Sequence, residues 1–226
     1  MKKSLVFLAL LVAVIVLTAL LRSGEHPATP PSEGLPWQIK ALPDGTSEVF
    51  GLVLDRSHLS DARTRFGLDV EIAVIAAPGE AGTLEAYYNN VTIGVFTGKL
   101  ILLAAMDKDT VTQLRQRAVK VEYMDSTTRK YHLQHDDLAL AWQAPIASIT
   151  FIPAVSLDTE TVLRRFGAPQ ERIRVDERVE HFLYPDKGLD LVLDSQGKEV
   201  LQYVAPRQFA RLREPLIKAA ANTQRP

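Results

Sequence analysis

The stretch 157–167, LDTETVLRRFG, decides the fold that we expect for this chain. Asp158 belongs to the residue types that cap helix N-termini, because a side-chain oxygen can accept a hydrogen bond from a free backbone N–H. Leu157 and Val162 stand at the spacing at which apolar side chains pack across a helix start. Gly167 commonly ends a helix, since glycine reaches positive φ at no steric cost. The pattern predicts a short helix between Asp158 and Gly167.

The same pattern occurs earlier in the chain. The stretch 59–67, LSDARTRFG, closes on the same Arg-Phe-Gly tripeptide. Strand-like runs follow each copy, with hairpin turns expected at Thr97-Gly98 and at Asp194 to Gly197. An internal repeat predicts two units, about 48–105 and 147–205, each built from a short helix and an antiparallel sheet.

The first residues of the chain predict a membrane anchor. Residues 4–21, SLVFLALLVAVIVLTALL, carry no charge, and as a helix they would span ~27 Å, close to the thickness of a bilayer core. A cleaved signal peptide is the alternative, but its apolar region is usually about 7–15 residues long and ends in a small-residue cleavage site. Lys2 and Lys3 precede the segment, so the positive-inside rule places residues 1–3 in the cytoplasm. We expect a single pass through the inner membrane of a bacterium, with the C-terminal domain in the periplasm.

The rest of the chain divides into a linker, a domain and a tail. Residues 22–36, RSGEHPATPPSEGLP, are rich in proline, which predicts an extended linker. An exported domain is expected over 37–221, and a C-terminal helix and tail over 206–226, where Pro206 suits a first helical turn. The expected fold class is α+β: an N-terminal transmembrane helix, then two repeated units of short helix plus antiparallel sheet.

Composition argues against several functional classes. The chain has no cysteine and a net charge of −1 over 226 residues. It therefore has no disulfide, no thiolate nucleophile and no lipidated cysteine. The balanced charge gives no basic footprint for nucleic acid. No G-x-S-x-G, H-E-x-x-H or phosphate-binding glycine loop is present, so no cofactor is expected and a non-catalytic role is favoured over an enzyme.

Three motifs of the second copy carry a resemblance to known proteins. They are Arg165-Phe166-Gly167-Ala168-Pro169, Phe182-Leu183-Tyr184-Pro185 and Gly197-Lys198. On these motifs, residues 156–204 resemble the repeat of the small outer-membrane-assembly lipoproteins and of β-lactamase-inhibitory protein. Residues 59–103 match more loosely, because no proline stands two residues after the glycine. The resemblance implies a non-catalytic module that binds another envelope protein, although this chain lacks the lipidated cysteine of the lipoproteins.

Aromatic residues on the expected strands are the candidate partner-binding side chains. Large aromatic groups often dominate protein interfaces. An alternative is that half or more of these residues fill the core. The candidates are Tyr87 and Tyr88 in the first unit and Phe182, Tyr184 and Tyr203 in the second.

A cluster of histidine and aspartate offers the alternative function. His132, His135, Asp136 and Asp137 form the densest group of potential metal ligands, and imidazole with carboxylate could hold zinc or another divalent ion. Such a site would make the chain a metal-dependent hydrolase or ligand-binding enzyme. The competing interpretation is structural, with His132 ending a strand and an aspartate capping the next turn. His181 is a further candidate for a general base, but the sequence shows no nucleophile beside it. We therefore favour a membrane-tethered protein-interaction module.

Overall fold

The computed structural model describes residues 34–124 and 127–223. The expected cytoplasmic N-terminus, the anchor at 4–21 and most of the linker at 22–36 lie outside the described residues. Within the described ranges, no helix combines the length and the apolar character needed to cross a bilayer.

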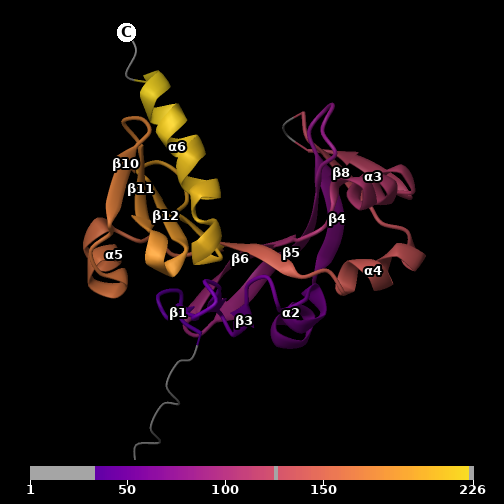
Figure 1. Ribbon diagram of the computed structural model, residues 1–226, viewed down its shortest axis with the longest axis horizontal. Coiled ribbons are helices and arrows are strands. Elements are labelled where there is room, and N and C mark those ends of the chain that lie inside the picture. The colour runs from indigo at the N-terminus through magenta and orange to yellow at the C-terminus, as the bar shows by residue number, and fades with distance from the viewer. Residues whose placement is uncertain (1–33, 125–126, 224–226) are drawn as a thin grey trace, which may run out of the picture. The chain divides into compact units, whose positions relative to one another are not determined.

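One antiparallel sheet of ten strands organises the described residues (Figure 1). A separate three-stranded sheet consists of β1 (Lys40–Ala41), β2 (Ser47–Val49) and β3 (Leu52–Val53). The order across the large sheet is β10 (Glu171–Arg174), β11 (Val179–Tyr184), β12 (Leu189–Asp194), β13 (Val200–Val204), β9 (Ile146–Pro153), β6 (Phe96–Ala104), β5 (Thr83–Ile93), β4 (Glu71–Ala76), β8 (Arg129–His132) and β7 (Lys120–Tyr123).

Five short α-helices accompany the sheets in the described ranges. Three 3₁₀ turns, η1 (His135–Asp137), η2 (Pro185–Lys187) and η3 (Pro206–Gln208), lie between the larger elements. The helices are α2 (Leu59–Phe66), α3 (Lys108–Gln116), α4 (Leu138–Trp142), α5 (Thr159–Phe166) and α6 (Ala210–Thr223).

The expected fold class is wrong. The prediction was α+β, with a transmembrane helix followed by two units that each hold a sheet, whereas the described residues are mostly sheet and contain no helix able to span a membrane. Strands from both units join one sheet because β9 pairs with β13 on one side, where Phe151 faces Leu201, and with β6 on the other, where Phe151 faces Leu100.

Both short helices of the repeat end where the sequence predicts, and the second also begins there, whereas the first begins at Leu59 with His58 at its N-cap position. Asp158 Oδ1 accepts a hydrogen bond of 2.7 Å from the backbone N–H of Thr161. The helices end at Gly67 (φ 98°, ψ −175°) and Gly167 (φ 85°, ψ −176°). These angles lie outside the left-handed helical region and in a region that is essentially restricted to glycine.

The first predicted hairpin turn is misplaced. Thr97-Gly98 lies inside β6, and the chain turns instead at Gly94 and Val95, between β5 and β6. A Cβ on Gly98 would come within 2.7 Å of Phe151 Cε2. Gly98 is therefore needed for close packing between strands and not for a turn. The second predicted turn, between β12 and β13, is confirmed.

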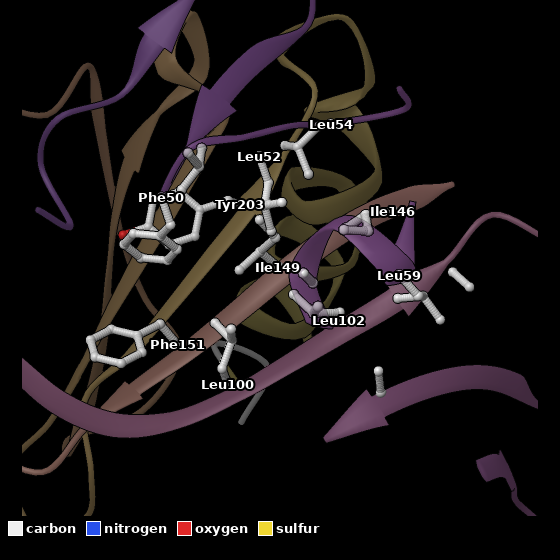
Figure 2. Packing of buried hydrophobic residues seen from close by; sticks show 14 of the residues in the cluster. Phe50, Leu52, Leu54, Leu59, Leu100, Leu102, Ile146, Ile149, Phe151 and Tyr203 are labelled. Atoms are coloured by element: carbon white, nitrogen blue, oxygen red, sulfur yellow. The ribbon is translucent and has the colours of Figure 1, made fainter. Parts of the chain in front are cut away.

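The core covers one face of the ten-stranded sheet. Leu100, Leu102, Ile149 and Phe151 point to the same side as Tyr203, as Figure 2 shows. From the small sheet, Phe50 packs edge-on against Phe151 and Tyr203, with ring centroids 5.6 and 5.3 Å apart. Buried side chains of α2, α3, α4 and α5 belong to the same cluster.

The opposite face of the sheet is covered by a helix at one end. Phe209, Leu212 and Leu216 lie on or just before α6 and pack against Ile173, Leu183 and Val204 at the β10–β13 end (Figure 1). Over β6, β5, β4 and β8, the same face carries side chains that are partly exposed, apart from the buried Ala73. We call this region the open face; its side chains are Glu71, Ala73, Ile75, Glu85, Tyr87, Ile101, Leu103, Lys130 and His132.

Candidate functional site

The open face contains a hollow of about 340 Å³. Strand alternation creates it, because every second residue of each strand points to this side. Tyr87 stands directly opposite Ile101 of β6 and Glu71 of β4. The lining is apolar at Ala73, Ile75, Tyr87, Ile101 and Met124, and charged at Glu71, Glu85 and Lys130.

Glu85 is the one carboxylate of this lining without a cation beside it in the described part of the chain. Its Oε1 accepts a hydrogen bond of 2.8 Å from Thr83 Oγ1. Burial raises the pKa of Glu85, and the Thr83 hydroxyl opposes this in part. On the neighbouring strands it faces Ala73 and Leu103, which are both apolar. A charged carboxylate in such surroundings is stabilised when a cation is brought to it.

The charges at the β4–β8–β7 end are already paired. Lys130 Nζ lies 3.0 Å from Glu71 Oε2 and 3.5 Å from Glu122 Oε2. His132 Nδ1 and Nε2 lie 3.5 Å from Glu71 Oε1 and 3.1 Å from Glu122 Oε2. The pKa of Glu122 is lowered to about 2, chiefly by a hydrogen bond from Lys120 and next by His132.

This network contains a geometric trio of potential metal ligands. Glu71, Glu122 and His132 can each offer one ligand atom within 4.8 Å of the others. Lys130 already lies within ion-pair distance of both carboxylates, and Lys120 pairs with Glu122 as well. We therefore interpret the trio as part of an ion-pair network that joins three strands.

The structure does not bring the four predicted metal ligands together. His132 ends β8 and faces Glu71 and Glu122, while His135 and Asp136 belong to η1. Asp137 is held by Arg117, whose Nη2 lies 2.6 Å from Oδ1. No local sequence signal pointed to Glu71 and Glu122, because they reach His132 only through the pairing of β4 and β7 with β8.

Burial separates the five candidate aromatic residues. Tyr87 lies on the open face and is partly exposed. The other four are less than 2% exposed and belong to the core: Tyr88, Phe182, Tyr184 and Tyr203. Adjacent strand residues point to opposite faces, so Tyr87 and Tyr88 could not both reach the surface. The four buried aromatic side chains are therefore unavailable to a partner in this structure.

The buried tyrosines differ in how their hydroxyls are bonded. Tyr203 donates to the carbonyl of Pro36 at 2.9 Å, and Tyr184 donates to the carbonyl of Gly167 at 2.9 Å. The hydroxyl of Tyr88 is buried without a hydrogen-bond partner in the described ranges. Burial raises the pKa of Tyr88 and of Tyr184 to about 12.

A buried histidine–aspartate pair lies on the face that α6 covers. His181 Nδ1 lies 2.9 Å from Asp190 Oδ2, and both residues are buried. A carboxylate in this position orients an imidazole, as in a catalytic triad. Within 34–124 and 127–223, no serine, threonine or tyrosine hydroxyl hydrogen-bonds to His181, so the geometry supplies no nucleophile.

A second hollow, of about 450 Å³, lies beside the start of α5. Four of its seven charged groups are paired with one another: Arg178 Nη2 is 3.3 Å from Asp194 Oδ2, and Arg174 Nη2 is 3.4 Å from Glu180 Oε2. Binding sites for organic groups are usually apolar with a few placed polar atoms. The open-face hollow fits that description better.

Comparison of the chain with protein-family models, with curated proteins and with solved structures finds no match. The resemblance to the small outer-membrane-assembly lipoproteins and to β-lactamase-inhibitory protein therefore stays a prediction. Function has to be inferred from the open face itself.

Proposed function

We propose that this chain is a non-catalytic protein-interaction module of the bacterial cell envelope, which binds a partner protein on the open face. The observation that supports the proposal is the apolar hollow with one carboxylate, Glu85, that has no cation of its own among the described residues. The occupant that complements this surface is a protein segment with a lysine or arginine flanked by apolar side chains.

The apolar part of the hollow would supply most of the binding free energy. Tyr87, Ile75 and Ile101 all line it, and water leaves such surface favourably when an apolar group covers it. A tyrosine at the centre of an interface is a frequent hot spot, where truncation costs about 2 kcal/mol or more.

Glu85 would supply specificity. A basic side chain that reached Glu85 would form a charge-assisted hydrogen bond in desolvated surroundings. Lys130 does not fill this role, because its ammonium group is bound to Glu71 at 3.0 Å. A partner with an acidic group at this position would be repelled.

The location in the envelope is a separate part of the proposal. Residues 4–21 would hold the chain in the inner membrane, and the domain would lie in the periplasm. Support comes from the sequence alone: the segment is uncharged, and Lys2 and Lys3 precede it.

Site-specific photo-crosslinking in living cells tests the binding proposal. A photoreactive amino acid at Ile101 lies in the hollow, whereas one at Leu68, which is 74% exposed and outside the lining, is the control. We expect a specific crosslinked protein from position 101 and not from position 68. Tyr87→Ala and Glu85→Gln should weaken that crosslink without changing the melting temperature. If neither substitution affects it, the hollow is not the binding site.

A charge exchange then tests the chemistry of the occupant. Glu85→Lys should abolish the crosslink, and a lysine-to-glutamate or arginine-to-glutamate change at the contacting position of the captured protein should restore it. Glu177→Lys, an acidic position outside the hollow, is the matched control and should leave the crosslink unchanged. If no single exchange restores the crosslink, the assignment of a basic side chain to Glu85 is wrong.

A further inference from the structure

Strand β7 is an edge of the ten-stranded sheet with an unusually apolar surface. It pairs with β8 on one side and has no strand on the other within the described residues. Val119, Val121 and Tyr123 are 69%, 43% and 76% exposed. Because they alternate along the chain, they point to one face, while Lys120 and Glu122 point to the other.

The free edge also offers unpaired backbone groups. The Met124 N–H donates to the carbonyl oxygen of Thr128 at 3.1 Å, so Met124 and Thr128 form a hydrogen-bonded pair across β7 and β8. Hydrogen-bonded and non-hydrogen-bonded pairs alternate along antiparallel strands. The neighbouring pair, Tyr123 with Arg129, is therefore a non-hydrogen-bonded one. By the same alternation, the N–H and C=O groups of Val121 and Tyr123 point away from β8. Folded proteins usually protect such an edge with charge, proline or a covering segment.

We propose that β7 of a second copy of this chain pairs antiparallel with this edge, centred on Val121. The five residues 119–123 read Val-Lys-Val-Glu-Tyr and complement themselves in this register. Val121 faces Val121 of the second copy, and Val119 faces its Tyr123, so the apolar side chains form one stripe. On the other face, Lys120 lies opposite Glu122 of the second copy, and the pair occurs twice.

The charges specify this register over its neighbours. A shift centred on Lys120 would place that lysine opposite itself, and a shift centred on Glu122 would place that glutamate opposite itself; like charges on directly opposite residues are destabilising. Only the register centred on Val121 joins opposite charges on one face and apolar groups on the other. An interface with two-fold symmetry is the commonest arrangement in homo-oligomers, and the axis would pass between the two hydrogen bonds that join the Val121 residues. The pairing does not depend on the proposed function.

Single cysteines test the register, because the natural chain has none. The full chain is purified in mild detergent and exposed to a mild oxidant. Val121→Cys should form disulfide-linked dimers, since opposite Cα atoms about 5.5 Å apart lie within disulfide reach. Tyr123→Cys alone should not, because equivalent residues would be offset by four positions, ~13 Å. A mixture of Val119→Cys and Tyr123→Cys chains should crosslink again.

Charge substitutions and mass measurement complete the test. Analytical ultracentrifugation of the unmodified chain should show a monomer–dimer equilibrium, and Lys120→Glu should weaken dimerisation by roughly tenfold through two like-charge contacts. The double variant K120E/E122K should recover dimerisation, because the complementarity returns. A monomer at all concentrations, or equal crosslinking of Val121→Cys and Tyr123→Cys, would overturn the proposal. The same oxidation carried out in intact membranes would overturn it if Val121→Cys formed a disulfide to a different protein and none between copies.

Discussion

Removing single hydroxyl groups from the buried tyrosines should change stability in opposite directions. Tyr203, Tyr184 and Tyr88 are each at most 1% exposed, so replacement by phenylalanine leaves their packing almost unchanged. They differ in hydrogen bonding alone. Tyr203 and Tyr184 donate to carbonyls, and Tyr88 has a buried hydroxyl that bonds to no described residue.

The expected magnitudes follow from this difference. Tyr203→Phe removes a bond to Pro36, which is itself buried, and a lost bond that strands a buried carbonyl costs about 1–2 kcal/mol. Tyr184→Phe should cost roughly 0.5–1 kcal/mol, since water can replace the donor at the exposed Gly167. Tyr88→Phe removes an unsatisfied polar group and should be neutral or stabilise by up to about 1 kcal/mol.

Urea unfolding of the full chain in mild detergent, followed by tryptophan fluorescence, measures these differences. A change of 1 kcal/mol corresponds to a melting-temperature shift of about 2–4 °C in a domain of this size. The reasoning is refuted if Tyr88→Phe loses as much stability as Tyr203→Phe, because the hydroxyl of Tyr88 would then have a partner.

Three other perturbations are informative. Gly167→Ala and Gly67→Ala should each cost about 1–3 kcal/mol of stability. A Cβ at either position meets no atom within 4 Å, so the cost comes from the positive φ of the backbone and not from a clash. An unchanged urea midpoint would show that the helix ends can relax. The pKa of Glu122, about 2 instead of 4.5, means that the folded state binds this proton less readily than the unfolded chain. Its stabilising contribution should be present above about pH 4.5 and disappear as the pH falls toward 2, so Glu122→Gln should lose less stability than the unmodified chain between pH 7 and pH 3. Added zinc should leave the melting temperature unchanged. If zinc raised the melting temperature of the unmodified chain but not that of His132→Ala, the metal would have displaced Lys130 from the carboxylates.

Local sequence patterns predicted the short helices well. Asp158 and Gly167 act within a few residues of their own position, so their roles can be read without knowing the rest of the fold. Strand β9 shows the limit of such reading. Its residues Ser148 to Phe151 alternate clearly between polar and apolar, but only its pairing with both β6 and β13 makes one sheet out of two expected ones.

The candidate site was less predictable for the same reason. Tyr87 and Tyr88 are equivalent by residue type, and only the strand register decides which one is buried. Glu71 and Glu85 gained their surroundings from strands brought beside them by sheet pairing, and Glu122 gained its own from the adjacent β7–β8 hairpin. Their assignment needed the sheet order, which neither composition nor spacing contains.

The attachment of the chain's entry point has a mechanical consequence. Pro36 is bonded to Tyr203 in β13, and the neighbouring Trp37 packs edge-on against Phe96 and Phe166, with centroids 5.5 and 6.0 Å apart. Phe96 begins β6 and Phe166 ends α5, so this small region contacts both halves of the sheet. A pulling force that arrived along the backbone at residue 34 would load the interior of the sheet, and many contacts would have to break together. A tether attached at a sheet edge would instead peel strands away one at a time under the same load.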